Sequence, residues 1–318
     1  MFIQQAAKAI REAELGGPLT TIDDGVLTGY SGEKLIGALQ RLCRLHDGDP
    51  TACYLEIGVF QGLTLLSVAH SMPSMPCHGI DNFAFFDPDG ANLGIVEARR
   101  AALGATNAHL INEDYEDALQ DLDRHLEGCR VALLFVDGPH DYRSQLMCLQ
   151  LALPHLHDQA VIIVDDSNYA HVRQANRDFL VTHPEFRLLF EAYTRCHPQN
   201  MPQHEHDNAC KGWWNGVNIL VRDPDGTLPA SYPPTERDRT LFENDHILHA
   251  SPAAPFLPAA SGLVSAIDRL SPIAFLAQAA ALKLKMRGTA PARKGMYRAM
   301  NTGSEGLPEA IHHHRDQD

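Results

Sequence analysis

The stretch VALLFVDGPHDYRSQLMCLQLALPHLHDQAVIIVDDSN, residues 131–168, decides the fold class. It holds two nearly continuous apolar runs, 131–136 and 160–164, separated by leucines at helical spacing. Uninterrupted runs of Val, Ile and Leu that flank a helix are typical of parallel strands buried on both faces of a sheet. The first run ends in Asp-Gly-Pro-His at 137–140, and the second ends in Asp165-Asp166. Because ligands bind outside the carboxyl ends of such strands, we expect these polar residues at the functional edge.

The alternation of strand and helix patterns continues on both sides of this stretch. Five strand-and-helix repeats, followed by a closing pair of strands, predict a doubly wound α/β domain over 50–222 with a mostly parallel, seven-stranded sheet. The further strands are predicted at 53–59, 78–80, 109–112, 186–192 and 216–222, and the further helices at 2–15, 32–46, 62–69, 92–103, 115–126 and 172–183.

Composition divides the chain into three segments: N-terminal helices at 1–48, the α/β domain at 49–223, and a C-terminal extension at 224–318. The extension begins Pro-rich, then carries a partly basic, amphipathic helix pair at 260–287 and a loose tail. The stripe of the helix at 271–287 is typical of packing on the domain or on a second subunit, which would make a homo-oligomer. It is also compatible with peripheral contact with a membrane surface.

The bulk numbers exclude some functions. The net charge of −14 argues against a nucleic-acid partner, which requires a basic surface. Seven scattered cysteines favour reduced thiols in a cytoplasmic protein over a disulfide framework. The N-terminus lacks the apolar core of a signal peptide, and no window is long and apolar enough for a transmembrane segment.

The first strand leads into EIGVFQG, residues 56–62, which has the features of a cofactor loop. Gly58 and Gly62 allow a tight turn and a close approach of the backbone to a ligand at a helix N-terminus. The spacing is not GxGxxG, so a dinucleotide is disfavoured, and Glu56 suits an amino-bearing ligand better than phosphates. Asp81 lies nineteen residues past Gly62, at the end of the next strand, where it can accept both hydroxyls of a ribose.

Three carboxylates, Asp137, Asp165 and Asp166, are predicted to converge at the carboxyl ends of two strands. Oxygen ligands of this kind favour Mg²⁺, Mn²⁺ or Ca²⁺. Asp residues that follow a strand also commonly cap the next helix, and the two roles can coexist. A second feature is the Trp-Trp-Asn run at 213–215, which suits stacking on a sugar or aromatic ring as well as packing of a hairpin.

These motifs resemble known families. The loop at 56–62, Asp81, and NEDYEDAL at 112–119 resemble the cofactor motifs of class I S-adenosylmethionine methyltransferases. FVDGPHDY at 135–142, together with IVDDS at 163–167, resembles the macrocin/novobiocin-type O-methyltransferases of the methyltransferase-24 family. The resemblance covers residues 30–222 and implies the Rossmann-like fold of class I methyltransferases, with an acceptor pocket built from loops and the N-terminal helices.

Carried over by position, the resemblance implies that Glu56 and Gly58 border the methionine part of the cofactor and that Asp81 holds its ribose. Asp114 and Tyr115 would lie against the adenine. Many relatives carry Gly-Asp-Ser or Gly-Thr-Ser where this chain has Glu-Asp-Tyr at 113–115, so the adenine contacts depart from the family pattern.

The resemblance implies a metal-dependent O-methyltransferase that acts on a hydroxyl of a small molecule, sugar or glycoconjugate. Methyl transfer is an in-line displacement, so positioning supplies much of the rate, and chelation of the acceptor oxygens by the metal would lower their pKa. The base is His140 or Asp137, and the pKa of histidine is better matched to neutral pH. Two alternatives remain: a hydroxylase-like relative that uses a redox metal at the same carboxylates, and a non-catalytic methyltransferase-like module.

Overall fold

The computed structural model describes residues 2–22, 26–84, 86–236 and 256–287. The chain divides into two compact units, 1–238 and 239–318. The first contains the α/β domain and the second contains a pair of helices.

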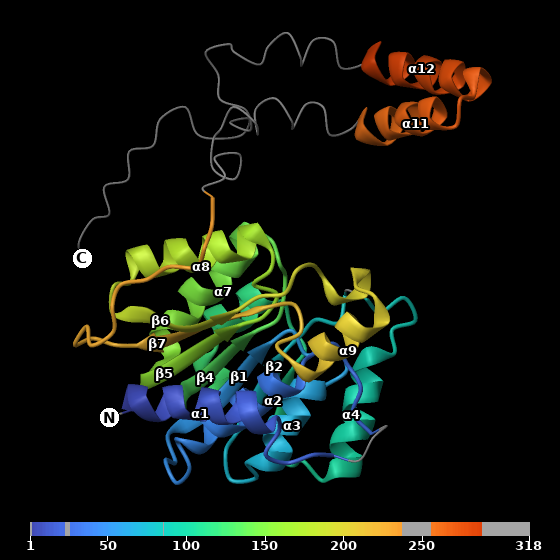
Figure 1. Ribbon diagram of the computed structural model, residues 1–318. Coiled ribbons are helices and arrows are strands. Elements are labelled where there is room, and N and C mark those ends of the chain that lie inside the picture. The colour runs from blue at the N-terminus through green and yellow to red at the C-terminus, as the bar shows by residue number, and fades with distance from the viewer. Residues whose placement is uncertain (1, 23–25, 85, 237–255, 288–318) are drawn as a thin grey trace, which may run out of the picture. The chain divides into compact units, whose positions relative to one another are not determined.

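The first unit is built on a seven-stranded sheet with the order β3-β2-β1-β4-β5-β7-β6 (Figure 1). Only β7 runs antiparallel to its neighbours, β5 and β6, so the predicted doubly wound, mostly parallel sheet is confirmed. The strands that follow β1 are added first toward one edge of the sheet, as β2 and β3, and then toward the other edge, beginning with β4. A crevice forms where the direction of strand addition reverses in this way, between β1 and β4. The strands are β1 Ala52–Ile57, β2 Cys77–Ile80, β3 Ala108–Ile111, β4 Arg130–Val136, β5 Leu156–Val164, β6 Phe186–Ala192 and β7 Val217–Arg222.

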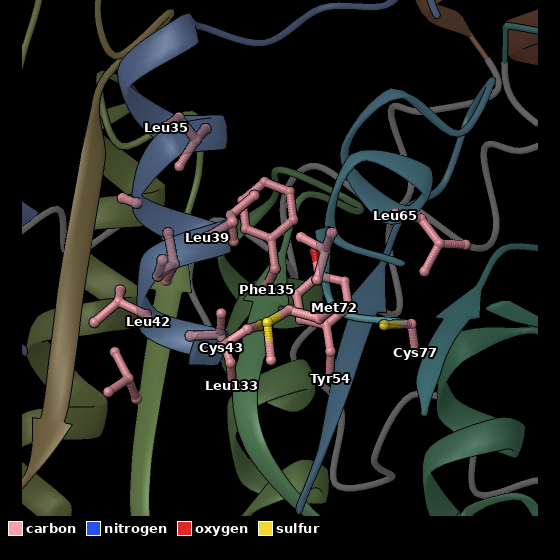
Figure 2. Close-up of a cluster of buried hydrophobic side chains, with 14 of the residues drawn as sticks. Leu35, Leu39, Leu42, Cys43, Tyr54, Leu65, Met72, Cys77, Leu133 and Phe135 are labelled. Atoms are coloured by element: carbon pink, nitrogen blue, oxygen red, sulfur yellow. The ribbon is translucent and has the colours of Figure 1, made fainter. Parts of the chain in front are cut away.

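Helices cover both faces of this sheet (Figure 1). One face carries α1 Phe2–Gly16, α2 Glu33–Arg44 and α3 Leu63–Ser71, and the other carries α5 Tyr115–Gln120, α7 Tyr142–Ala152 and α8 Ala170–Thr182. Successive residues of a strand point to opposite faces, so Tyr54 and Leu55 belong to two different hydrophobic cores. Figure 2 shows the first core, where Leu35, Leu39 and Leu42 of α2 face side chains of β1 and β4.

Two segments differ from the sequence prediction. The single helix expected at 115–126 is interrupted and forms α5 and a short α6, Asp123–Leu126. The segment between β6 and β7, where the sequence predicts no helix, contains the short helix η2 Pro198–Asn200 and the helix α9 Gln203–Lys211. Ala209 is the only residue of α9 that is buried, so the sequence carried no hydrophobic periodicity to reveal the helix.

The second unit confirms the predicted helix pair at 260–287 as α11 Leu257–Asp268 and α12 Pro272–Arg287. The predicted linker in part, and the whole of the predicted loose tail, lie outside the described residues. Among the helices described, none combines the length and the apolar composition needed to cross a bilayer.

Candidate active site

The loop between β1 and α3 is fastened to the end of β2. Asp81 Oδ2 accepts hydrogen bonds from the backbone N–H groups of Val59, at 2.9 Å, and Phe60, at 2.8 Å. Its Oδ1 accepts a third from Phe83, at 2.7 Å. A carboxylate offers about four lone-pair positions, so Asp81 keeps capacity for one more donor while it fixes the loop.

The glycines of this loop are required by geometry. Gly58 has φ +92°, and a Cβ placed on it would lie 2.1 Å from the carbonyl oxygen of Asp137. The loop after β1 therefore touches the backbone at the end of β4, and only glycine permits that approach. Gly62, with φ +82°, is the N-cap residue of α3. The predicted cofactor loop and the first predicted metal ligand are thus direct neighbours.

Glu56 lies beneath the loop and is fully buried. It accepts hydrogen bonds from Tyr54 Oη at 2.5 Å and from Thr64 Oγ1 at 2.7 Å, so it joins β1 to the first turn of α3. Burial raises the pKa of Glu56 to about 8, although both hydrogen bonds act to lower it. Sequence reasoning missed Tyr54 and Thr64; the alternation that places Tyr54 and Glu56 on one face of the strand was the available signal.

The raised pKa of Glu56 predicts a pH dependence of stability. A carboxyl group with a pKa of 4.5 when exposed and about 8 when folded favours the folded state fully below pH 4.5. That contribution is lost as the pH rises toward 8. We expect the free energy of unfolding of the wild type, measured with urea, to fall over this range more steeply than that of Glu56→Gln. Equal slopes for the two proteins would contradict the assignment.

Asp137, His140 and Asp166 form a group of ligand-type side chains at the carboxyl ends of β4 and β5. One ligand atom from each lies within 4.8 Å of the others. His140 Nε2 is 2.8 Å from Asp166 Oδ2. Asp165 is buried beside them: its Oδ1 accepts the backbone N–H of Asp166 at 2.8 Å, and among the described residues its Oδ2 has no hydrogen-bond partner.

The electrostatics of these carboxylates are unequal. Burial and the neighbouring carboxylates raise the pKa of Asp137 and of Asp165 well above the ordinary value. Burial also acts to raise the pKa of Asp166, but hydrogen bonds from His140 and Asn215 outweigh it and hold that pKa below its ordinary value. Without a bound cation, the repulsion between these carboxylates and the buried oxygen that lacks a hydrogen-bond partner both destabilise the folded protein. The donor set of carboxylate oxygens and one imidazole fits a divalent cation.

Asn215 and Asn168 support the cluster, and neither was assigned this position from the sequence. Asn215 Nδ2 donates to Asp166 Oδ1 at 2.7 Å, and Asn168 Nδ2 donates to Asn215 Oδ1 at 2.9 Å. Gly216, with φ +86°, leaves room for Asn168, because a Cβ there would lie 2.7 Å from its Oδ1. The Trp-Trp-Asn run at 213–215 thus contributes an amide that orients Asp166, which itself has a left-handed φ of +53°.

A series of neighbouring aromatic and imidazole rings connects the loop after β1 with the carboxylate cluster. The Tyr30 ring lies 5.6 Å from that of Phe60 and 6.0 Å from that of Trp214. From Trp214 the series continues through His197, at 6.2 Å, and Tyr169, at 6.5 Å from His197 and 6.0 Å from His140. Phe60 and Trp214, like Asp166, have positive φ, and strained residues of this kind gather at functional sites.

Asp114 and Tyr115 lie after β3, away from the carboxylate cluster. Asp114 is the N-cap of α5 and accepts the backbone N–H of Glu116 at 2.9 Å. The Tyr115 hydroxyl donates to Glu116 Oε1 at 2.9 Å, and its ring packs against the second core. Both residues have local structural roles, and their predicted contacts with adenine stay predictions.

Comparisons with known proteins agree with the geometry. Residues 55–167 match the family model described as a methyltransferase domain, that of the methyltransferase-24 family. The match begins within β1 and includes the glycine loop, β4 and β5. The comparison with curated proteins found no match.

Similar solved structures include three O-methyltransferases. A putative O-methyltransferase from Klebsiella pneumoniae is 16% identical, with 70% of this chain and 90% of that chain covered and a TM-score of 0.43. An O-methyltransferase from Bacillus cereus, in complex with SAH, is 13% identical, with coverages of 70% and 90% and a TM-score of 0.44. The O-methyltransferase TomG from Streptomyces achromogenes, in complex with SAM, is 19% identical, with coverages of 70% and 89% and a TM-score of 0.42.

The family match and the site lie on the same segment. The residues matched by the family model include the loop held by Asp81 and the carboxylates at the ends of β4 and β5. These are the same motifs on which the resemblance in the sequence is based. The chain therefore carries a methyltransferase domain over residues 55–167.

Proposed function

We propose that this protein is an S-adenosylmethionine- and Mg²⁺-dependent O-methyltransferase that acts on a hydroxyl of a small molecule, sugar or glycoconjugate. The observation that carries the proposal is the close approach of Gly58 to the backbone of Asp137. It sets a methyl-donor loop directly beside a cation-type cluster, and a metal-assisted transfer to oxygen needs both within reach of one acceptor.

The residues around the loop fit the donor. Gly58, with Glu56 beneath it, would border its methionine part, and Asp81 has acceptor capacity left for a ribose hydroxyl. Asp114 and Tyr115 would lie against the adenine. When bound, S-adenosylmethionine supplies an activated methyl group. Glu56 would support the loop indirectly, because it accepts a hydrogen bond from Thr64 and so fixes the start of α3.

Asp137, Asp165 and Asp166 would hold the cation. The unpaired Oδ2 of buried Asp165 and the mutual repulsion of the carboxylates support this assignment. A bound divalent cation would lower the pKa of an acceptor hydroxyl. Asn215 and His140 keep Asp166 oriented through its two oxygens.

His140 is the better candidate for the base that removes the acceptor proton. Its side chain is one-third exposed, and its Nε2 contacts Asp166, which would stabilise the imidazolium. We expect His140→Gln to lower kcat by about 10²-fold or more and to flatten the acidic limb of its pH profile. The control is His204→Gln, which replaces an exposed histidine of α9 and should leave kcat and the pH profile unchanged. An unaltered pH profile in His140→Gln would assign the base to Asp137.

Residues 1–48 would cap the acceptor pocket. Tyr30 lies beside Phe60 and Trp214, and the start of α2 is tied to the end of α9 by a hydrogen bond from Lys34 N–H to the carbonyl of Gly212, at 3.1 Å. The rings of Tyr30, Phe60 and Trp214 would suit stacking on a flat acceptor ring that presents a hydroxyl toward His140.

The reaction is tested by following S-adenosylhomocysteine formation with a panel of catechols, phenols, sugars and nucleotide sugars. We expect turnover with at least one hydroxyl acceptor in Mg²⁺ and its loss in EDTA. Turnover that persists in EDTA would contradict the metal requirement. Dependence on Fe²⁺ and oxygen, without S-adenosylhomocysteine, would establish the hydroxylase alternative instead.

A further inference from the structure

Helix α12 is apolar on two opposite sides. Phe275, Leu282 and Met286 line an open hollow of about 570 Å³ together with Leu263 and Ile267 of α11. At 100° per residue, Ile273 and Leu284 lie on the opposite side of α12, and Leu276 lies on the flank beside Lys283 and Arg287. The exposed fractions of Ile273, Leu276 and Leu284 are 83%, 67% and 70%. Large apolar side chains on a helix are normally covered, and nothing in the described part of the second unit covers Ile273, Leu276 and Leu284.

The α11–α12 hairpin also differs in charge from the rest of the chain. Residues 256–287 contain four of the 26 Lys and Arg residues but one of the 40 Asp and Glu residues, which gives a net charge of +3 in a chain of −14. Three of the four cations, Lys283, Lys285 and Arg287, are at the end of α12. Lys283 and Arg287 lie on the rim of the apolar hollow. Apolar surface edged by cations is complementary to an anionic amphiphile.

We propose that the α11–α12 hairpin binds the surface of membranes that contain anionic phospholipids. Ile273, Leu276 and Leu284 enter the boundary between headgroups and acyl chains, and the three basic residues at the end of α12 contact lipid phosphates. The hollow between the helices receives part of an acyl chain. At 16 residues, α12 is shorter than the roughly 20 that a spanning helix needs, so the hairpin lies on the membrane.

A second copy of the hairpin is the less suitable partner. Two hairpins would each carry the same +3 charge, with one carboxylate apiece to offset it. Pairing through Ile273, Leu276 and Leu284 would therefore bring together cations without counter-charges, whereas an anionic bilayer supplies counter-charges and apolar contact at once.

The test is co-sedimentation of the full chain with vesicles, either pure phosphatidylcholine or phosphatidylcholine with 30% phosphatidylglycerol. We expect binding to the anionic vesicles alone, and release as the salt concentration is raised. Lys283→Gln/Lys285→Gln/Arg287→Gln should weaken the partition about a hundredfold, since each basic residue near the surface contributes about fivefold. Ile273→Ser/Leu276→Ser leaves the charge unchanged and should weaken it by at least about tenfold.

The matched control is Lys8→Gln/Arg11→Gln/Arg44→Gln, which removes three cations from the first unit. It should bind vesicles like the wild type, and circular dichroism should show that every variant is folded. Three results would overturn the proposal: no sedimentation of the wild type with anionic vesicles, equal sedimentation with neutral vesicles, or an equal loss in the control. None of these readouts depends on methyl transfer, so they are independent of the proposed activity.

Discussion

Gly58→Ala is expected to reduce the affinity for S-adenosylmethionine by at least about a hundredfold, because the added methyl group cannot be accommodated without moving the donor loop or the end of β4. Its Cβ would lie 2.1 Å from the carbonyl oxygen of Asp137 and 2.9 Å from the backbone nitrogen of Gly138. Both are backbone atoms directly after β4 and cannot rotate away as a side chain could. The loop hydrogen bonds to Asp81 would be strained by the same movement.

Gly128→Ala provides a matched control. Gly128 has the same φ of +92°, but a Cβ there meets nothing within 4 Å. Both variants carry the backbone strain of a left-handed alanine, which costs about 1–3 kcal/mol. Only Gly58→Ala adds the collision. Titration calorimetry with S-adenosylmethionine should show near wild-type affinity for Gly128→Ala, and urea unfolding should show that both proteins are folded. Equal affinities for the two variants would refute the close approach as the basis of the site.

Asp165→Asn is expected to stabilise the metal-free protein while it removes stabilisation by Mg²⁺. The Oδ2 of Asp165 is buried without a partner, and its charge is repelled by Asp166. Since its pKa is raised, the wild-type group contributes stability at low pH that is lost as the pH rises. The gain from the substitution should therefore be larger at pH 8 than at pH 5, and at pH 8 should reach about 1 kcal/mol or more.

Thermal unfolding in EDTA and in Mg²⁺ measures both effects. At a hundred times its dissociation constant, Mg²⁺ should stabilise the wild type by about 2.7 kcal/mol and leave Asp165→Asn unchanged. Asp141→Asn is the control, because Asp141 caps α7 by accepting the backbone N–H of Ser144 at 3.0 Å, and asparagine caps equally well. Stabilisation of Asp165→Asn by Mg²⁺ as large as in the wild type would place the cation elsewhere.

The sheet and the approach of Asp137 to Asp166 could be predicted because both follow from the chain pattern, although His140, and not Asp165, completes the group of ligand atoms within 4.8 Å of one another. Apolar runs identify buried parallel strands, and residues that directly follow adjacent strands meet at one edge. The same reasoning placed Asp81 beside the loop after β1, where it holds the backbone of Val59 and Phe60.

Contacts made across long sequence separations could not be predicted in this way. Asn215 reaches Asp166 across 49 residues, and its position depends on the antiparallel insertion of β7 between β5 and β6. Helix α2 begins after Gly32, whose missing side chain lets the backbone of Gly212 approach, and this contact across the fold left no local signal in the sequence. Helix α9 is held by neighbours instead of by an apolar stripe of its own.

The central claim is that the donor loop and the carboxylate cluster form one site. The most direct test is titration calorimetry of S-adenosylmethionine and of Mg²⁺ against the wild type and Asp165→Asn/Asp166→Asn. We predict micromolar binding of S-adenosylmethionine to both proteins, since the loop is intact in both, and binding of Mg²⁺ to the wild type alone. Absence of S-adenosylmethionine binding by folded wild-type protein would contradict the account and leave a non-catalytic module as its replacement.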